Sequence, residues 1–343
     1  MSGTRVALVA TVVVAAIPLA LARGASEPPR PLHGARLEER TGLRLAVAYV
    51  APFLLDVDSR RVTRIRGIRN GTWVVGIGGR AAVVVADPFS QRGRVYGFRG
   101  RLARLGAGAE AAPGRDGTSV WVKRIIGHSR CTLRQVRLDG HLVRGPKPFR
   151  CASSLAAGGS LGVQVSDTRI IDPRTGTTVF RSPRDRLGQR LGILAVAGKS
   201  VLLQDGPGRP LVLLDTTSGV RRQIDWPSNI GQLDTPAVDV GGRRIALSFA
   251  NPSWTGRAGQ AFDAWVLDTR TSKLTHLPGM PAFVWLKWTN MAWTQGGRLV
   301  ILTRDETRQM VALWRPGHKR LGLKNVRLPN HDSAPSDTFA IVG

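Results

Sequence analysis

Two short segments that combine glycine with serine resemble reactive loops, but their spacing or surroundings argue against that chemistry. Gly158-Gly-Ser-Leu-Gly162 matches the G-x-S-x-G nucleophile elbow, in which a strained turn between a strand and a helix exposes a serine. In this chain it occupies the same place as Gly241-Gly242-Arg243, a turn between two apolar runs rich in β-formers. Gly198-Lys-Ser200 resembles the end of a phosphate loop, but five residues rather than four separate it from Gly192, and no helix follows. We therefore expect no catalytic residue.

The six histidines lack the spacing of a metal site. They are His33, His128, His141, His276, His318 and His331. None forms the H-x₃-H or HExxH pattern that places two imidazoles on one helix face. Isolated histidines in polar turns are most often surface residues, so we expect no metal and no cofactor. A ring-shaped fold could still gather distant ligands at its axis.

Cys131 and Cys151 are the only thiols of the chain. They flank the hairpin-like segment CTLRQVRLDGHLVRGPKPFRC, and two cysteines in an exported chain favour a disulfide. Closing a loop of about 20 residues would stabilise the fold by roughly 3 kcal/mol in the chain-entropy model. Two buried free thiols are the alternative.

Aromatic residues gather toward the C-terminal end of the chain. Five of the nine tryptophans are Trp254, Trp265, Trp285, Trp288 and Trp293. Trp254 shares a polar loop with Arg257, and aromatic faces beside an arginine suit sugars or extended polymers. Trp254, Arg257, Trp285 and Trp288 are therefore a candidate ligand-binding patch. Packing of large rings between structural units is the alternative.

The chain is strongly basic, with 50 Lys+Arg against 23 Asp+Glu and a formal net charge of +27. Between Ser59 and Leu105, eleven arginines accompany a single acid, Asp87. The candidate contacts to a polyanion are Arg61, Arg64, Arg66, Arg99 and Arg101. An anionic lipid or a cell-wall polymer would be a suitable partner, and a nucleic acid is not expected. The alternative is a general preference for arginine on solvated faces.

The N-terminus carries an apolar run from Val6 to Ala22. The run is longer than a usual signal-peptide core and barely long enough to span a membrane. We expect residues 1–23 to be a signal peptide cleaved after Ala22 or a retained anchor, followed by a linker over 24–42. The protein is thus expected outside the cytoplasm, either secreted or anchored on the outer face of the cytoplasmic membrane.

From Leu43 onward, the chain consists of short predicted strands separated by two kinds of recurring turn, and these strands must position the candidate residues. One turn precedes an apolar run and contains Gly79, Gly117, Gly159, Gly198, Gly242 or Gly297. The other is polar, often begins with Asp, and recurs about every 43 residues, the period of four-stranded propeller blades. The sequence predicts an all-β chain with one seven-bladed β-propeller over 43–343, with six or eight blades as alternatives. The first unit lacks a strand, which segment 338–342 would supply to close the ring.

Three of the polar turns carry a resemblance to a known group. Asp172-Pro-Arg-Thr-Gly176, Asp215-Thr-Thr-Ser-Gly219 and Asp268-Thr-Arg-Thr-Ser272 each follow a strand, and segment 261–302 contains FDAWVLDTRTSKL and MAWTQGGRLVIL. In these features the chain resembles exported actinobacterial TolB-like and WD40-like (YVTN-type) β-propellers of unassigned function. The resemblance implies the architecture. The sequence shows neither the six blades nor the extra N-terminal domain of TolB, so a role in translocation does not follow.

These features together predict a non-catalytic binding or scaffold propeller at the cell envelope. Its partner would be an unknown protein or an envelope polymer, and the propeller is expected to be monomeric. The alternative is a propeller enzyme of the lyase, hydrolase or quinoprotein type with an axial active site. Such a site would need acidic or histidine side chains that converge on the axis, and the chain holds few acids outside its turns.

Overall fold

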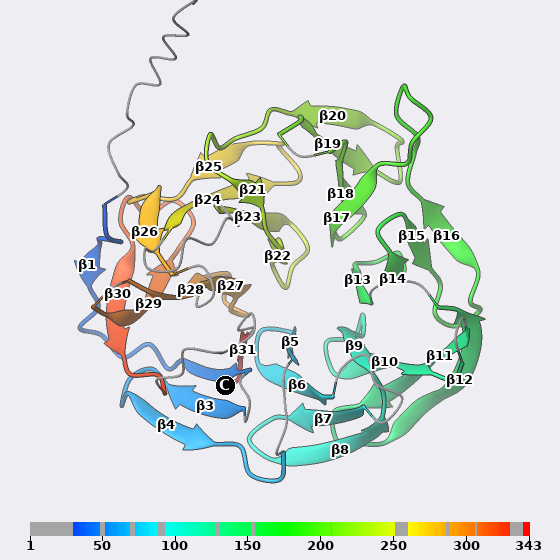
Figure 1. The fold of residues 1–343 in the computed structure, drawn as a ribbon, viewed down its shortest axis with the longest axis horizontal. Helices are drawn as coiled ribbons and strands as arrows, with labels where there is room; N and C mark the ends of the chain where they lie inside the picture. Colours follow the sequence, from blue (N-terminus) through cyan, green and yellow to red (C-terminus); the bar gives the residue numbers. More distant parts are fainter. Residues whose placement is uncertain are drawn as a thin grey trace, which may run out of the picture.

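Seven β-sheets stand around a central axis in the computed structural model (Figure 1). The structure describes residues 30–48, 52–68, 73–87, 93–127, 130–151, 155–206, 208–250, 260–285, 289–305, 307–329 and 339–343. Every element in these ranges is a strand. The all-β, seven-bladed propeller expected from the repeat is therefore confirmed.

The blades follow one another along the chain, and in blades 2 to 5 and 7 the first strand of the repeat lies nearest the axis (Figure 1). Blade 1 contains β31 (Phe339–Ile341), β2 (Arg44–Val47), β3 (Phe53–Asp56) and β4 (Arg61–Arg64). Blade 2 contains β5 (Trp73–Ile77), β6 (Ala81–Ala86), β7 (Arg94–Phe98) and β8 (Leu102–Ala107). Blade 3 contains β9 (Glu110–Pro113), β10 (Ser119–Ile125), β11 (Arg130–Arg137) and β12 (Leu142–Arg150). Blade 4 contains β13 (Ala156–Gly158), β14 (Gly162–Ser166), β15 (Arg169–Ile171) and β16 (Thr178–Arg181).

The remaining three blades complete the ring. Blade 5 contains β17 (Gly192–Ala197), β18 (Ser200–Gln204), β19 (Leu211–Asp215) and β20 (Arg221–Ile224). Blade 6 contains β21 (Gln232–Leu233), β22 (Ala237–Val238), β23 (Arg244–Ala250), β24 (Gln260–Asp268), β25 (Leu274–His276) and β26 (Ala282–Val284). Blade 7 contains β27 (Asn290–Trp293), β28 (Leu299–Arg304), β29 (Gln309–Trp314), β30 (Gly322–Val326) and, at its outer edge, β1 (Ala35–Arg36).

The hydrophobic core lies between neighbouring blades. The second strands are covered on both faces, which is why β6 reads as the uninterrupted apolar run Ala81–Ala86 and is buried throughout. Between blades 7 and 1, Leu45 and Leu55 pack in one cluster with Val300. Each blade therefore depends on its neighbours for burial.

The two ends of the propeller meet in blade 1. β31 pairs antiparallel with β2, with Leu45 opposite Ile341 and Val47 opposite Phe339. The C-terminal segment thus forms the innermost strand of the first blade, and no inner edge of that blade is left open.

Residues 30–42, which we call the strap, are packed against the ring and link three blades. Pro31 bridges to Phe283 in blade 6, and β1 pairs in parallel with β30 in blade 7. Leu32 is buried. In blade 1, Asp58 accepts hydrogen bonds from the backbone N–H groups of Thr41 (2.9 Å) and Gly42 (2.7 Å). This part of the expected linker is packed because its few apolar side chains find sites between blades.

The recurring glycine turns touch one another near the axis. Gly79 and Gly242 have φ values of 66° and 64°, which favour glycine. A Cβ atom on Gly79 would lie 2.6 Å from the backbone nitrogen of Gln295, and one on Gly242 would lie 2.7 Å from that of Gly198. The repeat of glycine therefore reflects both the turn conformation and close backbone approach.

The expected signal or anchor over residues 1–23 lies outside the described residues. In the part of the chain that the structure does describe, no helix has the length and apolar character needed to cross a membrane.

Candidate anion-binding clefts

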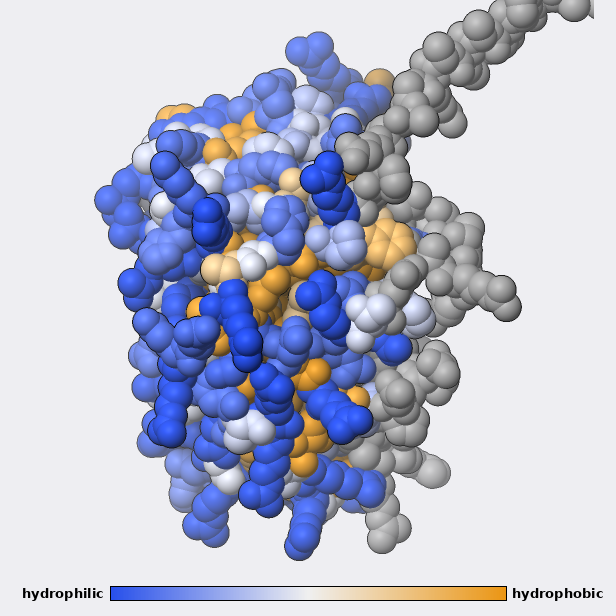
Figure 2. All heavy atoms as spheres, turned by 90° about the vertical axis from the view of Figure 1, so that its left-hand side faces the viewer, coloured by the Kyte–Doolittle hydropathy of each residue, from blue (hydrophilic) through white to orange (hydrophobic). Residues whose placement is uncertain are grey.

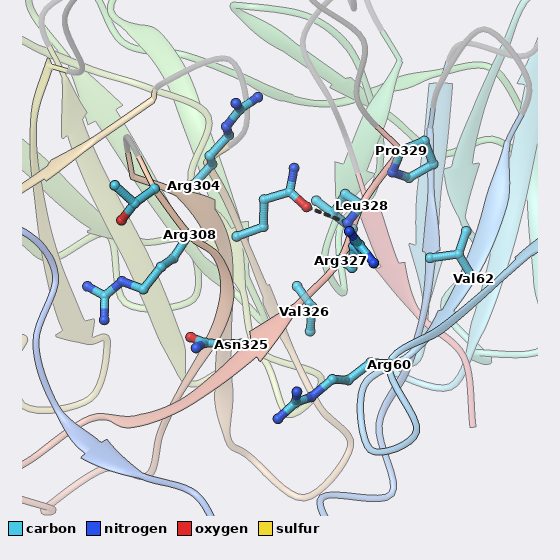
Figure 3. Close-up of a pocket in the computed structure, with 11 residues that line it drawn as sticks. Arg60, Val62, Arg304, Arg308, Asn325, Val326, Arg327, Leu328 and Pro329 are labelled. Atoms are coloured by element: carbon cyan, nitrogen blue, oxygen red, sulfur yellow. Dashed lines mark hydrogen bonds between the residues drawn. The ribbon is translucent and has the colours of Figure 1, made fainter.

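An open cleft of about 800 Å³ lies between the outer strands of blades 7 and 1 (Figure 3). We call it the 7–1 cleft. Its blade 7 wall comes from the end of β28, the turn into β29 and the end of β30, and its blade 1 wall comes from the start of β4. The lining residues are Arg60, Val62, Arg304, Thr307, Arg308, Gln309, Asn325, Val326, Arg327, Leu328 and Pro329. Figure 2 shows the side of the molecule that carries blade 7, with hydrophilic side chains over most of its surface.

Arg304 is held against an aromatic ring. Its guanidinium carbon lies 4.5 Å from the ring centroid of Trp285, one of the tryptophans of the predicted patch. An indole face attracts a guanidinium through its quadrupole and leaves the N–H groups at the edge of the fork free to donate. Arg304 is therefore positioned without its charge being neutralised by the contact.

Asp305 shapes the turn that presents Arg308. Its buried carboxylate accepts from the backbone N–H groups of Thr307 (2.9 Å) and Arg308 (2.6 Å). It also accepts from the Nη2 (2.9 Å) and Nε (3.1 Å) groups of the Arg308 side chain. Burial alone would raise the pKa of Asp305, but the hydrogen bonds from Thr307 and Arg308 outweigh it and lower that pKa. The turn is thus fixed by an ionised carboxylate at neutral pH.

Other parts of the cleft lining also have defined backbone positions. The side chain of Gln309 accepts a hydrogen bond from the backbone N–H of Leu328, which fixes the segment that carries Arg327. Arg60 sits in the β3–β4 turn with a φ of 58°, an unfavourable conformation for a residue with a Cβ atom. Gly219 and Ser272 have φ values of 73° and 60° at the equivalent place in blades 5 and 6, so this conformation belongs to the repeated blade turn.

Positive charge dominates the 7–1 cleft. Of its four arginines, Arg308 has an ion-pair partner, Asp305. Within the described residues, no acidic side chain pairs with Arg60, Arg304 or Arg327, and none lines the cleft. Guanidinium groups bind carboxylate, sulfate and phosphate through parallel N–H···O bonds, so the cleft is suited to oxyanions.

A second cleft, of about 410 Å³, lies between blades 2 and 3. We call it the 2–3 cleft. Its charged lining residues are Arg80, Arg99, Arg101, Arg137 and Asp139. Asp139 lies 3.5 Å from Arg137, and both side chains are more than half exposed, so this ion pair is weak. Net positive charge therefore remains.

The predicted polyanion contacts occupy one sector of the ring. Arg99 and Arg101 line the 2–3 cleft, as part of the turn between β7 and β8. Arg61 and Arg64 are exposed on β4, the outermost strand of blade 1, and Arg66 is exposed just after it. The structure does not place these five in one pocket, but it sets them along neighbouring blades.

The predicted aromatic patch is only partly described. Trp254, Arg257 and Trp288 lie outside the described residues, whereas Trp285 packs beside Arg304 at the 7–1 cleft. Trp293 is buried and donates to the backbone oxygen of Ala237 at 3.0 Å. For Trp293, therefore, packing between blades is the role that the structure shows.

One histidine has a buried partner. Nε2 of His276 lies 2.6 Å from the carboxylate of Asp263, which also accepts from the indole N–H of Trp265 at 2.8 Å. The rings of Trp265 and His276 are stacked, with centroids 4.2 Å apart. Burial would raise the pKa of Asp263, but the hydrogen bonds from His276 and Trp265 lower it. This carboxylate therefore helps to hold β24 and β25 together.

No metal-ligating cluster of three His, Cys, Asp or Glu side chains occurs among the described residues. The predicted disulfide is present: Cys131 and Cys151 are bonded, with Cα atoms 5.0 Å apart. It joins the start of β11 to the residue that follows β12, and so cross-links the open end of the outer hairpin of blade 3. The alternative of two free thiols does not hold.

The 7–1 cleft was not identified from the sequence. Arg304, Arg308 and Arg327 come from blade 7, and Arg60, from the other end of the chain, joins them only because blade 7 packs against blade 1. One local signal was available. Arg304-Asp305-Glu-Thr-Arg308 separates two apolar strands, and an Asp that starts such a turn bonds the backbone two and three residues on.

Comparison with known proteins identifies the fold. No model of a protein family matches the sequence, and no curated protein matches it. Among solved structures, a putative 6-phosphogluconolactonase from Bacteroides uniformis is similar with a TM-score of 0.53 and 12% identity, over 88% of this chain and 100% of that one. The β-propeller domain of the Trilobed protease from Pyrococcus furiosus has a TM-score of 0.52 and 11% identity, over 88% and 99%. TolB from Acinetobacter baumannii has a TM-score of 0.45 and 12% identity, over 88% and 67%. At these identities the similarity is one of β-propeller architecture.

Proposed function

We propose that this protein is a non-catalytic β-propeller of the cell envelope that binds oxyanion groups of an envelope partner in the 7–1 cleft. The observation that carries the proposal is the set of three arginines, Arg60, Arg304 and Arg327, that line one cleft without an acidic partner among the described residues. The oxyanion can be the phosphate, sulfate or carboxylate of an anionic lipid, a cell-wall polymer or a protein.

The electrostatics of the cleft favour an occupied state. Like charges that line one cleft repel one another, and an anion with two or more oxygens reduces that repulsion while it accepts charge-assisted hydrogen bonds. The three arginines reach the cleft from a turn of blade 1, the end of β28 and the segment after β30. The backbone positions of these donors are set by the ring, and the stacking of Arg304 on Trp285 places one guanidinium before the ligand arrives, which lowers the entropic cost of binding.

A location outside the cytoplasm agrees with two features of the chain. The apolar run from Val6 to Ala22 has the character of an export signal or an anchor. The disulfide between Cys131 and Cys151 belongs to the kind of bond that forms and persists in oxidising compartments. Both support an envelope protein, either secreted or tethered to the outer face of the cytoplasmic membrane.

The competing proposal is a propeller enzyme. The histidine–carboxylate pair with the most favourable geometry, His276 with Asp263, would be its natural general base. We favour binding because the hydrogen bonds of Asp263 are used to join strands of blade 6, and because the unneutralised charge lies in the 7–1 cleft instead.

Titration calorimetry with sodium triphosphate tests the proposal. We expect Arg304→Gln and Arg327→Gln each to weaken triphosphate binding about ten-fold or more, the effect of losing hydrogen bonds to a charged group. Arg221→Gln, which removes an equal charge from the outer strand of blade 5, is the matched control and should leave binding within two-fold. Binding should also weaken as salt rises, because exposed charges are screened within about 8 Å at physiological ionic strength. Triphosphate binding that all three variants retain, or its absence in the unmodified protein, would rule the proposal out.

A further inference from the structure

We infer that the ligand of the 7–1 cleft is a linear polyanion that continues from this cleft along β4 to the 2–3 cleft. The inference rests on the proposed function, because it extends the same site. It names the ligand class as a flexible chain of repeated anionic groups, as opposed to an isolated anion or a flat lipid surface.

The two clefts are joined by exposed arginines, which we call the arginine track. The track starts in the 7–1 cleft, where Arg60 and Val62 form the wall from which β4 leaves. Arg61 and Arg64 on β4 and then Arg66 follow, all exposed. Arg61 to Arg64 on the extended strand cover about 10 Å, and Arg66 lies in the turn that follows.

The far end of the track touches the second cleft. A Cβ atom on Gly67 would lie 3.2 Å from the side chain of Leu102, so this backbone is in direct contact with blade 2. Leu102 lines the 2–3 cleft together with Arg99 and Arg101. One step along the chain from Arg66 therefore reaches the residues that form the second cleft.

Acidic side chains near the track are already engaged. Asp56 accepts from the backbone N–H of Ser59 at 2.8 Å. Asp58 accepts from Lys324 Nζ at 2.6 Å, and from the two backbone N–H groups of the strap. From Ser59 to Leu105, Asp87 is the single acid in the sequence. Within the described residues, the acidic side chains nearest the track therefore leave its positive charge available to an external ligand.

The curvature of the ring favours a flexible chain over a membrane. In Figure 1, β4 and β8 run along the circumference, so the track follows the outside of the ring from blade 1 to blade 2. The two clefts lie two blade boundaries apart in a ring of seven sheets, which is about 100° of arc. A plane that touches a convex rim at one cleft is turned away from the other, whereas a polymer can bend around the rim.

Polyphosphate of several tens of units, compared with triphosphate, tests the inference on the full-length protein. We expect long polyphosphate to bind more tightly than triphosphate, with close to one chain per protein. Arg64→Gln combined with Arg66→Gln removes two track contacts, each worth up to about five-fold in Kd for an exposed ion pair. This double variant should weaken polyphosphate binding about ten-fold while changing triphosphate binding less than two-fold. Arg174→Gln combined with Arg221→Gln, on the outer parts of blades 4 and 5, is the matched control and should change neither.

The outcomes separate this inference from the proposed function. If triphosphate binds in the 7–1 cleft but the track variant binds long polyphosphate as well as the control does, the linear-polymer inference is wrong and the proposed function stands. If triphosphate does not bind at all, the proposed function fails and takes this inference with it. If the track variant loses binding to vesicles of phosphatidylglycerol and phosphatidylcholine but keeps its binding to polyphosphate, the partner is a membrane surface, and the inference is again overturned.

Discussion

Replacing Ile341 by Ala should weaken the whole propeller, because this side chain lies in the strand that joins the last part of the chain to blade 1. Ile341 is buried, lies opposite Leu45 of the neighbouring strand β2, and packs in the cluster between blades 7 and 1. Removing buried atoms from an Ile of this kind costs about 3 kcal/mol, within the observed range of 2–5. For a domain of this length, a loss of that size lowers the melting temperature by about 5 °C.

Ile126→Ala is the matched control, since it removes the same atoms from a side chain that is 48% exposed. Its cost should stay below about 0.5 kcal/mol, which is typical of surface substitutions. Urea unfolding followed by circular dichroism gives both free energies, and their difference isolates the contribution of burial in β31.

Hydrogen exchange tests whether the effect passes around the ring. β18, in blade 5, does not touch β31, but its deeply protected amides should exchange by global unfolding. A loss of 3 kcal/mol would speed their exchange about 100-fold. If exchange in β18 stayed unchanged while that of β2 rose, the C-terminal strand would only cover blade 1, and the argument that it closes a cooperative ring would be refuted.

Three further predictions follow from the packing and the ion pairs. Replacing both Cys131 and Cys151 by Ala should lower the free energy of unfolding by about 3 kcal/mol, because the unfolded chain is no longer cross-linked. Chemically reduced protein should match this variant in urea unfolding. An unchanged urea midpoint would contradict the prediction. Gly219→Ala, at a φ of 73° and with no neighbouring atom near the new Cβ, should lower the free energy of unfolding by about 1 kcal/mol. Gly242→Ala should lower it clearly more, because its Cβ would meet the backbone of blade 5. Equal losses would argue against close packing of the inner turns. Burial would raise the pKa of Asp58, but hydrogen bonds from Lys324 and the strap lower it below the ordinary 3.8. The ionised carboxylate should therefore stabilise the folded protein fully above pH 3.8, and this contribution should fall as the pH drops further. The difference in unfolding free energy between the unmodified protein and Asp58→Asn should therefore shrink below about pH 3.8, and a constant difference down to pH 2 would show that the ion pair contributes nothing.

The architecture was predictable because its signals are local. Gly79, Gly159 and Gly242 all have positive φ, so the recurring glycine marks a real backbone requirement in these blades. The polar turns are equally local. The carboxylate of Asp215 accepts from the backbone N–H groups of Thr217 and Ser218, at 2.8 and 3.0 Å. Chemistry of this kind repeats with the period of the blades and can be read without knowing any long-range contact.

The strap and the 7–1 cleft were not predictable in the same way. Strand β1 pairs over two residues only, and Leu32 and Leu37 stand among prolines, arginines and acids, so no periodic pattern marks that segment. In the cleft, Arg60 and Arg327 lie 267 positions apart in the numbering and meet through the packing of the first blade on the last. Which arginines of a basic chain remain unneutralised depends on where the acids end up, and that is a property of the folded ring.

The strap also determines how the molecule responds to a mechanical load. A pull on residue 30 would act first on the Pro31 bridge, the two-residue strand β1 and the contacts of Thr41 and Gly42, and not on the pairing of β31 with β2. Once peeled away, residues 30–42 would release about 45 Å of extended chain while the seven sheets stay joined. Tension applied at residue 30 would therefore unfold the strap first, and a single-molecule extension trace should show a short, low-force step well before the ring opens.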